Sequence, residues 1–349
     1  MAAPRRLLIF RFSSLGDVAM TVPVIKLLLQ QYPQLQVTVV STAFVKPLFD
    51  DIERLQFFAA DLRGRHKGFK GLYRLYRELK KQYAFDAIAD LHNVLRTKVL
   101  RSFFAMSGTR MAVVDKGRAE KKALTRPVNK ILQPLKSTFQ RYADVFEKLQ
   151  MPISLEVNSG VKKAPVLPDY QQLKQAGYRL VGIAPFAQYD RKMYPLEQMK
   201  EAVRLLLQHG EVKVLLFGGG KKETELLQQW EGELKGTQSM AGRMSFAEEL
   251  QVIGQLDVMV SMDSANMHLA SLYGVPVVSI WGATHPYAGF YGWGQSLHNA
   301  VQVELYCRPC SVFGNKPGVR DDLSCMHSIS PVMVYNTTMQ QLAAVGVTP

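Results

Sequence analysis

Asp17 lies at a position where α/β proteins often carry out chemistry. The apolar run Leu7–Phe10 is typical of a buried parallel strand, and a helical spacing of apolar residues begins at Val18. Open α/β sheets bind ligands at the carboxyl ends of their strands, so Asp17 could act as a base on a substrate. The alternative is that Asp17 only caps the helix. The turn is neither a G-x-G-x-x-G fingerprint nor a P-loop, which argues against ordinary dinucleotide or triphosphate binding.

A second polar segment follows the first strand expected in the other half of the chain. That strand covers residues 178–184, and Asp190, Arg191 and Lys192 come shortly after it. Two cations in a loop at the carboxyl end of a strand could neutralise a departing pyrophosphate. The alternative is a solvated run of charges that precedes a helix.

A third passage from strand to helix begins at Ser261. The strand ends there and a helix begins near Ser264, so the free N–H groups at the helix start could bind an anion. Asp263 is in place to hold sugar hydroxyls. His268 lies one turn into the helix, where the alternative is a hydrogen-bonded core histidine.

The three cysteines form a group near the end of the chain. They are Cys307, Cys310 and Cys325, and their odd number fits a reducing compartment. With His327 nearby, the C-x-x-C pair and the third cysteine are a weak candidate for a zinc site. The alternative is a reduced, partly buried cluster. No H-E-x-x-H, G-x-S-x-G or Walker A motif is present, and nothing resembles an RNA-binding aromatic platform.

Length and hydropathy set limits on the architecture. A chain of 349 residues is expected to form two domains. No apolar run approaches 18 residues, so we expect no transmembrane helix. The apolar run before Arg11 has four residues, which is too short for the core of a signal peptide. We therefore expect a cytoplasmic protein.

Positive charge is concentrated in the first half of the chain. Residues 1–164 hold 29 Lys and Arg against 13 Asp and Glu, a balance of +16, whereas residues 165–349 hold 14 against 16, a balance of −2. Two stretches, 62–81 and 116–136, are especially basic. Such a half attracts nucleic acid, an anionic membrane or an anionic substrate. The alternative is a soluble basic surface without a partner.

Strand and helix patterns alternate in both halves, which favours parallel sheets. The halves, 1–164 and 165–349, are each predicted to be a Rossmann-like domain, with a cleft between them and a linker near 158–168. The predicted strands are 7–11, 36–41, 56–60, 85–90, 110–114, 178–184, 212–217, 257–261 and 276–280. The predicted helices are 18–32, 71–83, 139–149, 196–208, 221–234, 245–254 and 331–344, with a further one near Ser264.

Four motifs together resemble the ADP-heptose:lipopolysaccharide heptosyltransferases, glycosyltransferase family 9. They are S-S-L-G-D-V-x-x-T-x-P (Ser13 to Pro23), D-R-K-x-Y-P (Asp190 to Pro195), D-S-x-x-x-H-L-A (Asp263 to Ala270) and W-G-A-T-H-P (Trp281 to Pro286). Their order and spacing match the family over nearly the whole chain.

The resemblance implies a GT-B fold, in which two Rossmann-like domains face each other across a cleft. The N-terminal domain would bind the acceptor, and the C-terminal domain the nucleotide-sugar donor. We also expect the C-terminal helix, 331–344, to return to the N-terminal domain. The implied reaction is inverting transfer of a heptose or related sugar from an ADP-sugar to the inner core of lipopolysaccharide, without an obligatory metal or other cofactor.

The resemblance also implies roles for individual residues. Asp17 matches the general base, and Lys192, next to Arg191, matches the lysine that contacts the donor phosphate. Asp263 matches the carboxylate that holds the donor sugar. Ser264, Ala265 and His268 fall in the phosphate-binding turn and helix of the family. Met244 matches a residue near the adenine. Relatives usually have Thr-Gly where this chain has Ser264-Ala265, so the backbone has less freedom here.

The basic first half suits an anionic, lipid-linked saccharide acceptor on the cytoplasmic face of the inner membrane. The candidate acceptor-binding residues are Ser13, Ser14, Gly16, Arg63 and Lys67. The stretches 62–81 and 116–136 would add a salt-sensitive, peripheral contact with the anionic membrane, and we expect no nucleic-acid partner.

Two alternatives remain at the level of sequence. The chain could be another nucleotide-sugar enzyme of the same fold, such as one for O-antigen or another glycan. It could also be a non-catalytic basic protein that binds anions or membranes.

Overall fold

The computed structural model describes residues 4–82, 84–156, 160–318, 320 and 322–345. Its chain forms two compact α/β units. Unit 1 comprises residues 1–116 and 137–160, and unit 2 comprises residues 117–136 and 161–349. The units therefore differ from the division at 164/165 because the basic segment 117–136 packs with the second half. Tyr83, at the end of the predicted helix 71–83, and residues 158–159 of the predicted linker lie outside the described residues.

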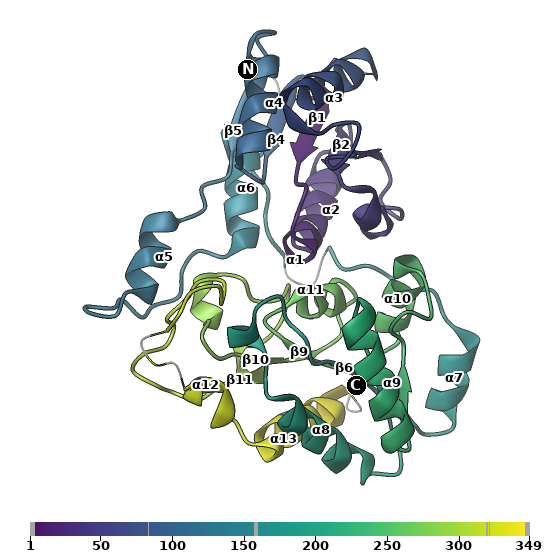
Figure 1. The fold of residues 1–349 in the computed structure, drawn as a ribbon. Coiled ribbons are helices and arrows are strands. Elements are labelled where there is room, and N and C mark those ends of the chain that lie inside the picture. Colours follow the sequence, from purple (N-terminus) through teal and green to yellow (C-terminus); the bar gives the residue numbers. More distant parts are fainter. Residues whose placement is uncertain (1–3, 83, 157–159, 319, 321, 346–349) are drawn as a thin grey trace. The chain divides into compact units, whose positions relative to one another are not determined.

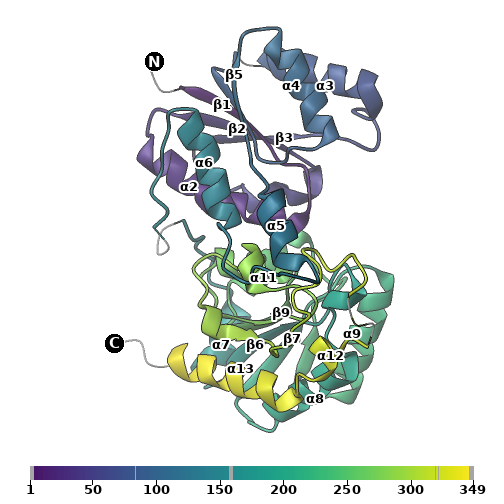
Figure 2. The same ribbon diagram turned by 90° about the vertical axis from the view of Figure 1, so that its left-hand side faces the viewer.

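Unit 1 is built on a five-stranded parallel sheet with the order β3-β2-β1-β4-β5. Its strands are β1 (Arg6–Phe10), β2 (Gln36–Ser41), β3 (Leu55–Ala59), β4 (Ala87–Asp90) and β5 (Arg110–Val113). Its helices are α1 (Leu15–Ala19), α2 (Thr21–Gln31), η1 (Ala43–Leu48), α3 (Gly68–Gln82), α4 (Leu95–Ala105) and α6 (Thr138–Lys148). Helices α2 and α6 lie on one face of the sheet, and α3 and α4 lie on the other (Figure 2).

The predicted helix 18–32 is two helices in the structure. It breaks between α1 and α2 at Met20, three residues before Pro23. Proline has no N–H to donate to an earlier carbonyl, so it is tolerated only in the first turn of a helix, and α2 starts anew. The Thr21 hydroxyl donates to the Val18 carbonyl oxygen at 2.7 Å and satisfies a group at the end of α1.

Unit 2 holds a six-stranded parallel sheet with the order β11-β10-β9-β6-β7-β8. Its strands are β6 (Arg179–Ala184), β7 (Val212–Leu216), β8 (Thr237–Ser239), β9 (Val258–Met262), β10 (Val277–Ile280) and β11 (Ala300–Val301). Its α-helices are α5 (Arg118–Thr125), α7 (Pro168–Gln175), α8 (Leu196–Leu207), α9 (Lys221–Glu233), α10 (Phe246–Ile253), α11 (Ala265–Leu272), α12 (Ser324–His327) and α13 (Pro331–Val345). Three short 3-10 helices complete it: η2 (Asp190–Lys192), η3 (Pro286–Ala288) and η4 (Leu297–Asn299).

The C-terminal helix was expected to return to the N-terminal domain, but it belongs to unit 2. Helix α13 packs against α8 and the strands β9, β10 and β11, all of unit 2 (Figure 1). Its buried residues Val334, Thr338 and Leu342 recur every four residues and form one face. Val334 and Leu342 belong to the apolar core of unit 2, so burial of this face holds the helix there.

The predicted parallel sheets are confirmed, but several elements were missed. The missed elements are α4, α5, α7, α12 and the strands β8 and β11. The two strands are three and two residues long, too short for a pattern of alternation to register. Helix α4 carries Arg96, Lys98 and Arg101 among its apolar positions, which weakens its helical pattern. Among the described residues, no helix is long and apolar enough to cross a membrane.

Candidate functional site

The Asp17 carboxylate is held by its own turn and by a buried arginine. Ser14 directly precedes α1, and Asp17 is the third residue of that helix. The Asp17 Oδ2 atom accepts from the Ser14 hydroxyl at 2.8 Å and from the Ser14 N–H at 3.3 Å. It also pairs with Arg11 Nη2 at 2.6 Å. Asp17 thus does contact the start of the helix, and its side chain is also 30 % exposed.

Arg11 connects the first strand with its neighbour in the sheet. Its Nη1 donates to the Leu91 carbonyl oxygen at 2.7 Å, and its guanidinium lies 6.0 Å from the centre of the Tyr142 ring. Tyr142 in turn donates its hydroxyl to the Asp17 carbonyl oxygen at 3.4 Å. Because β1 pairs directly with β4, residues just after the two strands meet at one edge. The sequence analysis missed Arg11 as a partner of Asp17.

His92 is a neutral histidine in this cluster. Its Nδ1 accepts from the Phe12 N–H at 3.3 Å, so the other ring nitrogen carries the proton. Burial lowers the pKa of His92 to about 3, and the nearby charges of Arg11 and Lys116 add to the effect. The turn that carries it is fixed by Asp90, whose Oδ1 accepts from the His92 N–H at 3.0 Å.

The predicted acceptor-binding residues fall into two groups. Ser13 and Ser14 are exposed beside Asp17, and Gly16 is buried in α1. Arg63 and Lys67 are exposed in the loop between β3 and α3. No hydrogen bond or ion pair in the described part of the chain joins that loop to Asp17.

Lys192 and Asp263 meet in unit 2. Lys192 Nζ lies 2.9 Å from Asp263 Oδ2, with the two side chains 14 % and 7 % exposed. Lys192 ends η2, which follows β6, and Asp263 directly follows β9. The two strands are paired, with Ala184 opposite Ser261, so both side chains come from one edge of the sheet. When a ligand binds such a pair, the lysine can bind its phosphate and the carboxylate can accept hydrogen bonds from its hydroxyl groups.

The other candidates of this half surround the pair unevenly. Ser264 is the residue before α11, and its hydroxyl lies 3.1 Å from that of Ser261. Ala265 begins α11, and His268 is buried one turn into it. Met244 lies before α10, and no hydrogen bond or ion pair among the described residues links it to Lys192 or Asp263.

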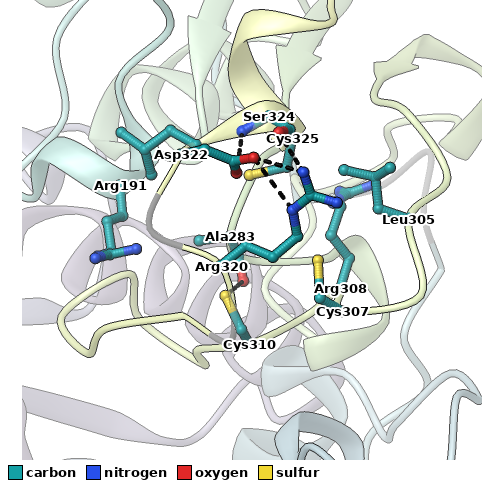
Figure 3. Close-up of a pocket in the computed structure, with 11 residues that line it drawn as sticks. Arg191, Ala283, Leu305, Cys307, Arg308, Cys310, Arg320, Asp322, Ser324 and Cys325 are labelled. Atoms are coloured by element: carbon teal, nitrogen blue, oxygen red, sulfur yellow. Dashed lines mark hydrogen bonds and ion pairs between the residues drawn. The ribbon is translucent and has the colours of Figure 1, made fainter.

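The cysteine loop, residues 305–318, and Cys325 of α12 lie beside Arg191. Figure 3 shows Cys307, Cys310 and Cys325 around a small pocket that Arg191 also lines. Burial raises the pKa of the Cys310 and Cys325 thiols, so both are protonated near neutral pH. Among the described residues, no group of three His, Cys, Asp or Glu side chains could hold a metal ion. The structure therefore gives the zinc candidate no support.

Two cations, the buried Arg308 and the half-buried Lys130, hold the cysteine loop in shape. Arg308 donates from Nε to the Gly282 carbonyl oxygen at 2.6 Å and from Nη2 to that of Trp281 at 3.1 Å. Lys130 Nζ, from the segment 117–136, donates to the carbonyl oxygens of Cys307 at 2.7 Å and Pro309 at 3.0 Å. Neither residue was singled out from the sequence, because a cation that binds backbone carbonyls leaves no motif.

Gly314 of this loop packs closely against the Lys192 side chain. Gly314 has a φ of +75°, and a Cβ built there would overlap the Lys192 side chain. Its N–H donates to the Ser311 hydroxyl at 2.9 Å, which fixes the turn. Glycine is needed at this position both for its backbone conformation and for the space that Lys192 occupies.

Comparison with known proteins identifies the family. The model of glycosyltransferase family 9 (heptosyltransferase) matches residues 72–317. The chain belongs to this family. It is therefore a glycosyltransferase, which argues against the alternative of a non-catalytic binding protein.

Curated relatives and solved structures agree with this assignment. A lipopolysaccharide core heptosyltransferase of Haemophilus influenzae is 22% identical over 294 residues, which cover 81% of each chain. A lipooligosaccharide heptosyltransferase 2 of the same organism is 26% identical and covers 80% of this chain and 84% of its own. The structure of the E. coli ADP-heptose lipopolysaccharide heptosyltransferase II has a TM-score of 0.69 at 16% identity, covering 98% and 100% of the two chains. This similarity confirms the predicted GT-B fold.

Replacing Gly314 tests how closely this family 9 enzyme must position Lys192. We expect Gly314→Ala to lower kcat/KM for sugar transfer by about 10- to 100-fold, because the methyl group displaces the lysine. Steady-state transfer assays measure this effect. Gly177→Ala is the matched control, since Gly177 also has a positive φ, +88°, and a Cβ there meets nothing within 4 Å. Equal activity of both variants would show that transfer does not depend on the close packing of Gly314 against Lys192.

The buried histidine makes the stability of the glycosyltransferase sensitive to acid. The pKa of His92 is about 3 in the folded chain and near 6.5 when unfolded, so the unfolded chain takes up the proton first. Stability therefore falls as the pH drops from 7 to 5, and His92→Gln should remove about 2 kcal/mol of that loss. Urea unfolding at the two pH values measures it, with the exposed His298→Gln as control. An unchanged pH dependence would contradict the assignment.

Proposed function

We propose that this glycosyltransferase transfers a heptose, or a related sugar, from an ADP-sugar to the inner core of lipopolysaccharide. The observation that carries the proposal is the buried Lys192–Asp263 pair at the carboxyl edge of the second sheet. It offers one group for phosphate and one for sugar hydroxyls. The names of the curated relatives, which are heptosyltransferases of lipopolysaccharide or lipooligosaccharide, support the choice of sugar and acceptor.

Asp17 is the proposed general base. Its carboxylate takes the proton of the acceptor hydroxyl while that oxygen attacks the anomeric carbon of the donor sugar. The bond from the anomeric carbon to the diphosphate breaks, and its electron pair leaves with ADP. One base and no second carboxylate nucleophile suffice for a single displacement, which inverts the anomeric centre. Arg11 and Ser14 hold the carboxylate in one orientation, so less ordering is required when the acceptor binds.

Lys192 is the proposed partner of the donor diphosphate. Its ammonium is paired with Asp263, so neither charge is buried alone. A diphosphate would take over Lys192 and leave Asp263 to accept from sugar hydroxyls. Arg191, Ser264, Ala265 and His268 are proposed to complete the phosphate site, and Met244 to lie near the adenine. These cations and the helix start would supply the charge stabilisation of the leaving group, with no obligatory metal.

The acceptor is proposed to bind to unit 1. Ser13, Ser14 and Gly16 would lie near the reacting hydroxyl, and Arg63 and Lys67 would pair with its phosphate or carboxylate groups. An acceptor that is both lipid-linked and anionic would bring the enzyme to the cytoplasmic face of the inner membrane, as a peripheral protein. The excess of positive charge in the first half of the chain supports this arrangement.

A donor screen tests the proposed nucleotide sugar. We expect ADP-heptose to protect the protein from thermal unfolding, by about 3 kcal/mol at a hundred-fold excess over its Kd, because the ligand binds only the folded state. UDP- and GDP-sugars should protect far less. Lys192→Met should abolish the protection. Protection by a UDP- or GDP-sugar and not by ADP-heptose would instead favour another nucleotide-sugar enzyme of this fold.

Asp17→Asn tests the proposed base separately from donor binding. We expect transfer to fall by about 10²- to 10⁴-fold, because the amide cannot accept the proton. Protection by the ADP-sugar should be retained, since the donor is proposed to bind unit 2. Asp50→Asn is the control, because Asp50 is exposed and, in the described part of the chain, forms its one ion pair with the nearby Lys46. Turnover of the Asp17→Asn variant at the wild-type rate would exclude Asp17 as the base.

A further inference from the structure

Helix α3 presents two distinct faces. One is buried against the first sheet and consists of Gly71, Leu72, Leu75, Tyr76 and Leu79. The other carries large aromatic rings in the open: Phe69 is 66% exposed and Tyr73 is 46% exposed. Most surface helices place polar residues at such positions, so two exposed rings on one helix indicate an interaction surface.

The exposed rings are held from behind. Phe103 of α4 meets the Phe69 ring edge-on at 5.3 Å and the Tyr73 ring at 5.4 Å, measured between ring centres. Helices α3 and α4 lie side by side in both views (Figures 1 and 2). The rings are therefore ordered by packing, and their outward faces require little further ordering when they contact a partner.

Positive charge surrounds the rings. Helix α3 contains five cations, Lys70, Arg74, Arg77, Lys80 and Lys81. Its single acid, Glu78, is already paired with Arg65 and His66. In the described part of the chain, neither Lys70 nor Arg77 forms an ion pair or a side-chain hydrogen bond. Helix α4 adds Arg96 and Lys98 and no acid, whereas its Arg101 is paired with Asp90 of β4.

The rings and cations share one side of α3. Phe69, Tyr73 and Arg77 follow each other at intervals of four residues, and Lys70 lies three residues before Tyr73. Residues three and four apart are neighbours on a helix surface. We call these four residues, Phe69, Lys70, Tyr73 and Arg77, the docking face.

We propose that the docking face binds the surface of an anionic phospholipid bilayer. Aromatic rings prefer the boundary between head groups and acyl chains, and Lys and Arg pair with the phosphates above them. Each cation near an anionic surface strengthens partitioning by about five-fold. The charge complementarity and the two rings favour a bilayer over a protein partner. The proposal rests on the proposed function in one respect: a lipid-linked acceptor lies in the membrane that the docking face would bind.

The docking face is separate from the residues proposed for chemistry. Arg63 and Lys67 precede α3, and Asp17 lies on α1, whereas the docking face lies along the first three turns of α3. A protein held at the bilayer through α3 would present the neighbouring loop, with Arg63 and Lys67, to lipid-linked saccharides in the same membrane.

Vesicle co-sedimentation of the full-length protein tests the proposal. The probes are vesicles of phosphatidylcholine alone and vesicles that also contain phosphatidylglycerol. We expect binding only to the anionic vesicles, with release at high salt. The variant Lys70→Glu/Arg77→Glu should weaken binding by about 25-fold or more, the product of two five-fold effects. The variant Phe69→Ser/Tyr73→Ser should weaken it by about ten-fold through loss of apolar contact.

Matched controls exclude trivial explanations. Lys221→Glu/Lys222→Glu changes two exposed lysines of α9, and Val332→Ser changes an exposed apolar residue of α13. Both should bind anionic vesicles as the wild type does. Thermal unfolding and transfer to a detergent-dispersed acceptor verify that the α3 variants are folded and active.

Each remaining outcome bears directly on the docking face. Unchanged vesicle binding by both α3 variants overturns the proposal. If the wild type binds a single-stranded RNA, and the α3 variants lose that binding but still bind vesicles, the docking face serves nucleic acid. That result also overturns the proposal. Failure of the proposed function gives a different result. In that case the wild-type protein binds vesicles but transfers no heptose to a detergent-dispersed acceptor.

Discussion

Parallel pairing of neighbouring strands is the constraint on which both candidate sites depend. When two parallel strands pair in register, the residues that follow them leave the sheet at the same edge. Strands β1 and β4 bring Arg11 next to the turn of Leu91 and His92, and β6 and β9 bring Lys192 next to Asp263. Residues 70 to 80 positions apart in sequence thereby become contacts within 3 Å. A shift in the register of β1 and β4 would separate Arg11 from Leu91, and a shift in that of β6 and β9 would separate Lys192 from Asp263.

Both sites keep a carboxylate against a cation in a partly buried place. Leaving one such charge alone would cost several kcal/mol, so the pairs stabilise the fold when no ligand is bound. They also limit what each carboxylate can do. Asp17 is held by Ser14 of its own turn and by Arg11, which also donates to the Leu91 carbonyl oxygen, whereas Asp263 pairs with Lys192. The two carboxylates thus suit different roles, one as a fixed acceptor and one that becomes available.

The sequence predicted the fold class, most of the strands along the chain and the places of Asp17, Lys192 and Asp263 after the ends of strands. These follow from local patterns, namely apolar runs that end in polar turns. It did not predict the partners of these residues. Arg11 was visible only as part of a turn, and its contact with Asp17 and Leu91 depends on which strands are neighbours in the sheet. Lys130 and Arg308 bind backbone carbonyls, whose positions are set by the fold and not by side-chain identity. The place of α13 was predicted wrongly because the expectation came with the family resemblance, and the helix's own apolar stripe shows that it is buried but not against which core.

The segment 117–136 gives the two units an unusual genetic layout. The polypeptide passes from one unit to the other three times, near residues 116, 136 and 160. Unit 2 is thus encoded in two separate stretches, and the first contributes Lys130 to the loop behind Lys192. Recombination between relatives at a single point near residue 160 would combine a lysine from one parent with a cysteine loop from the other. A chimera that exchanges unit 2 of this chain must therefore carry both stretches, because otherwise Lys130 and the carbonyl groups that it binds would come from different parents.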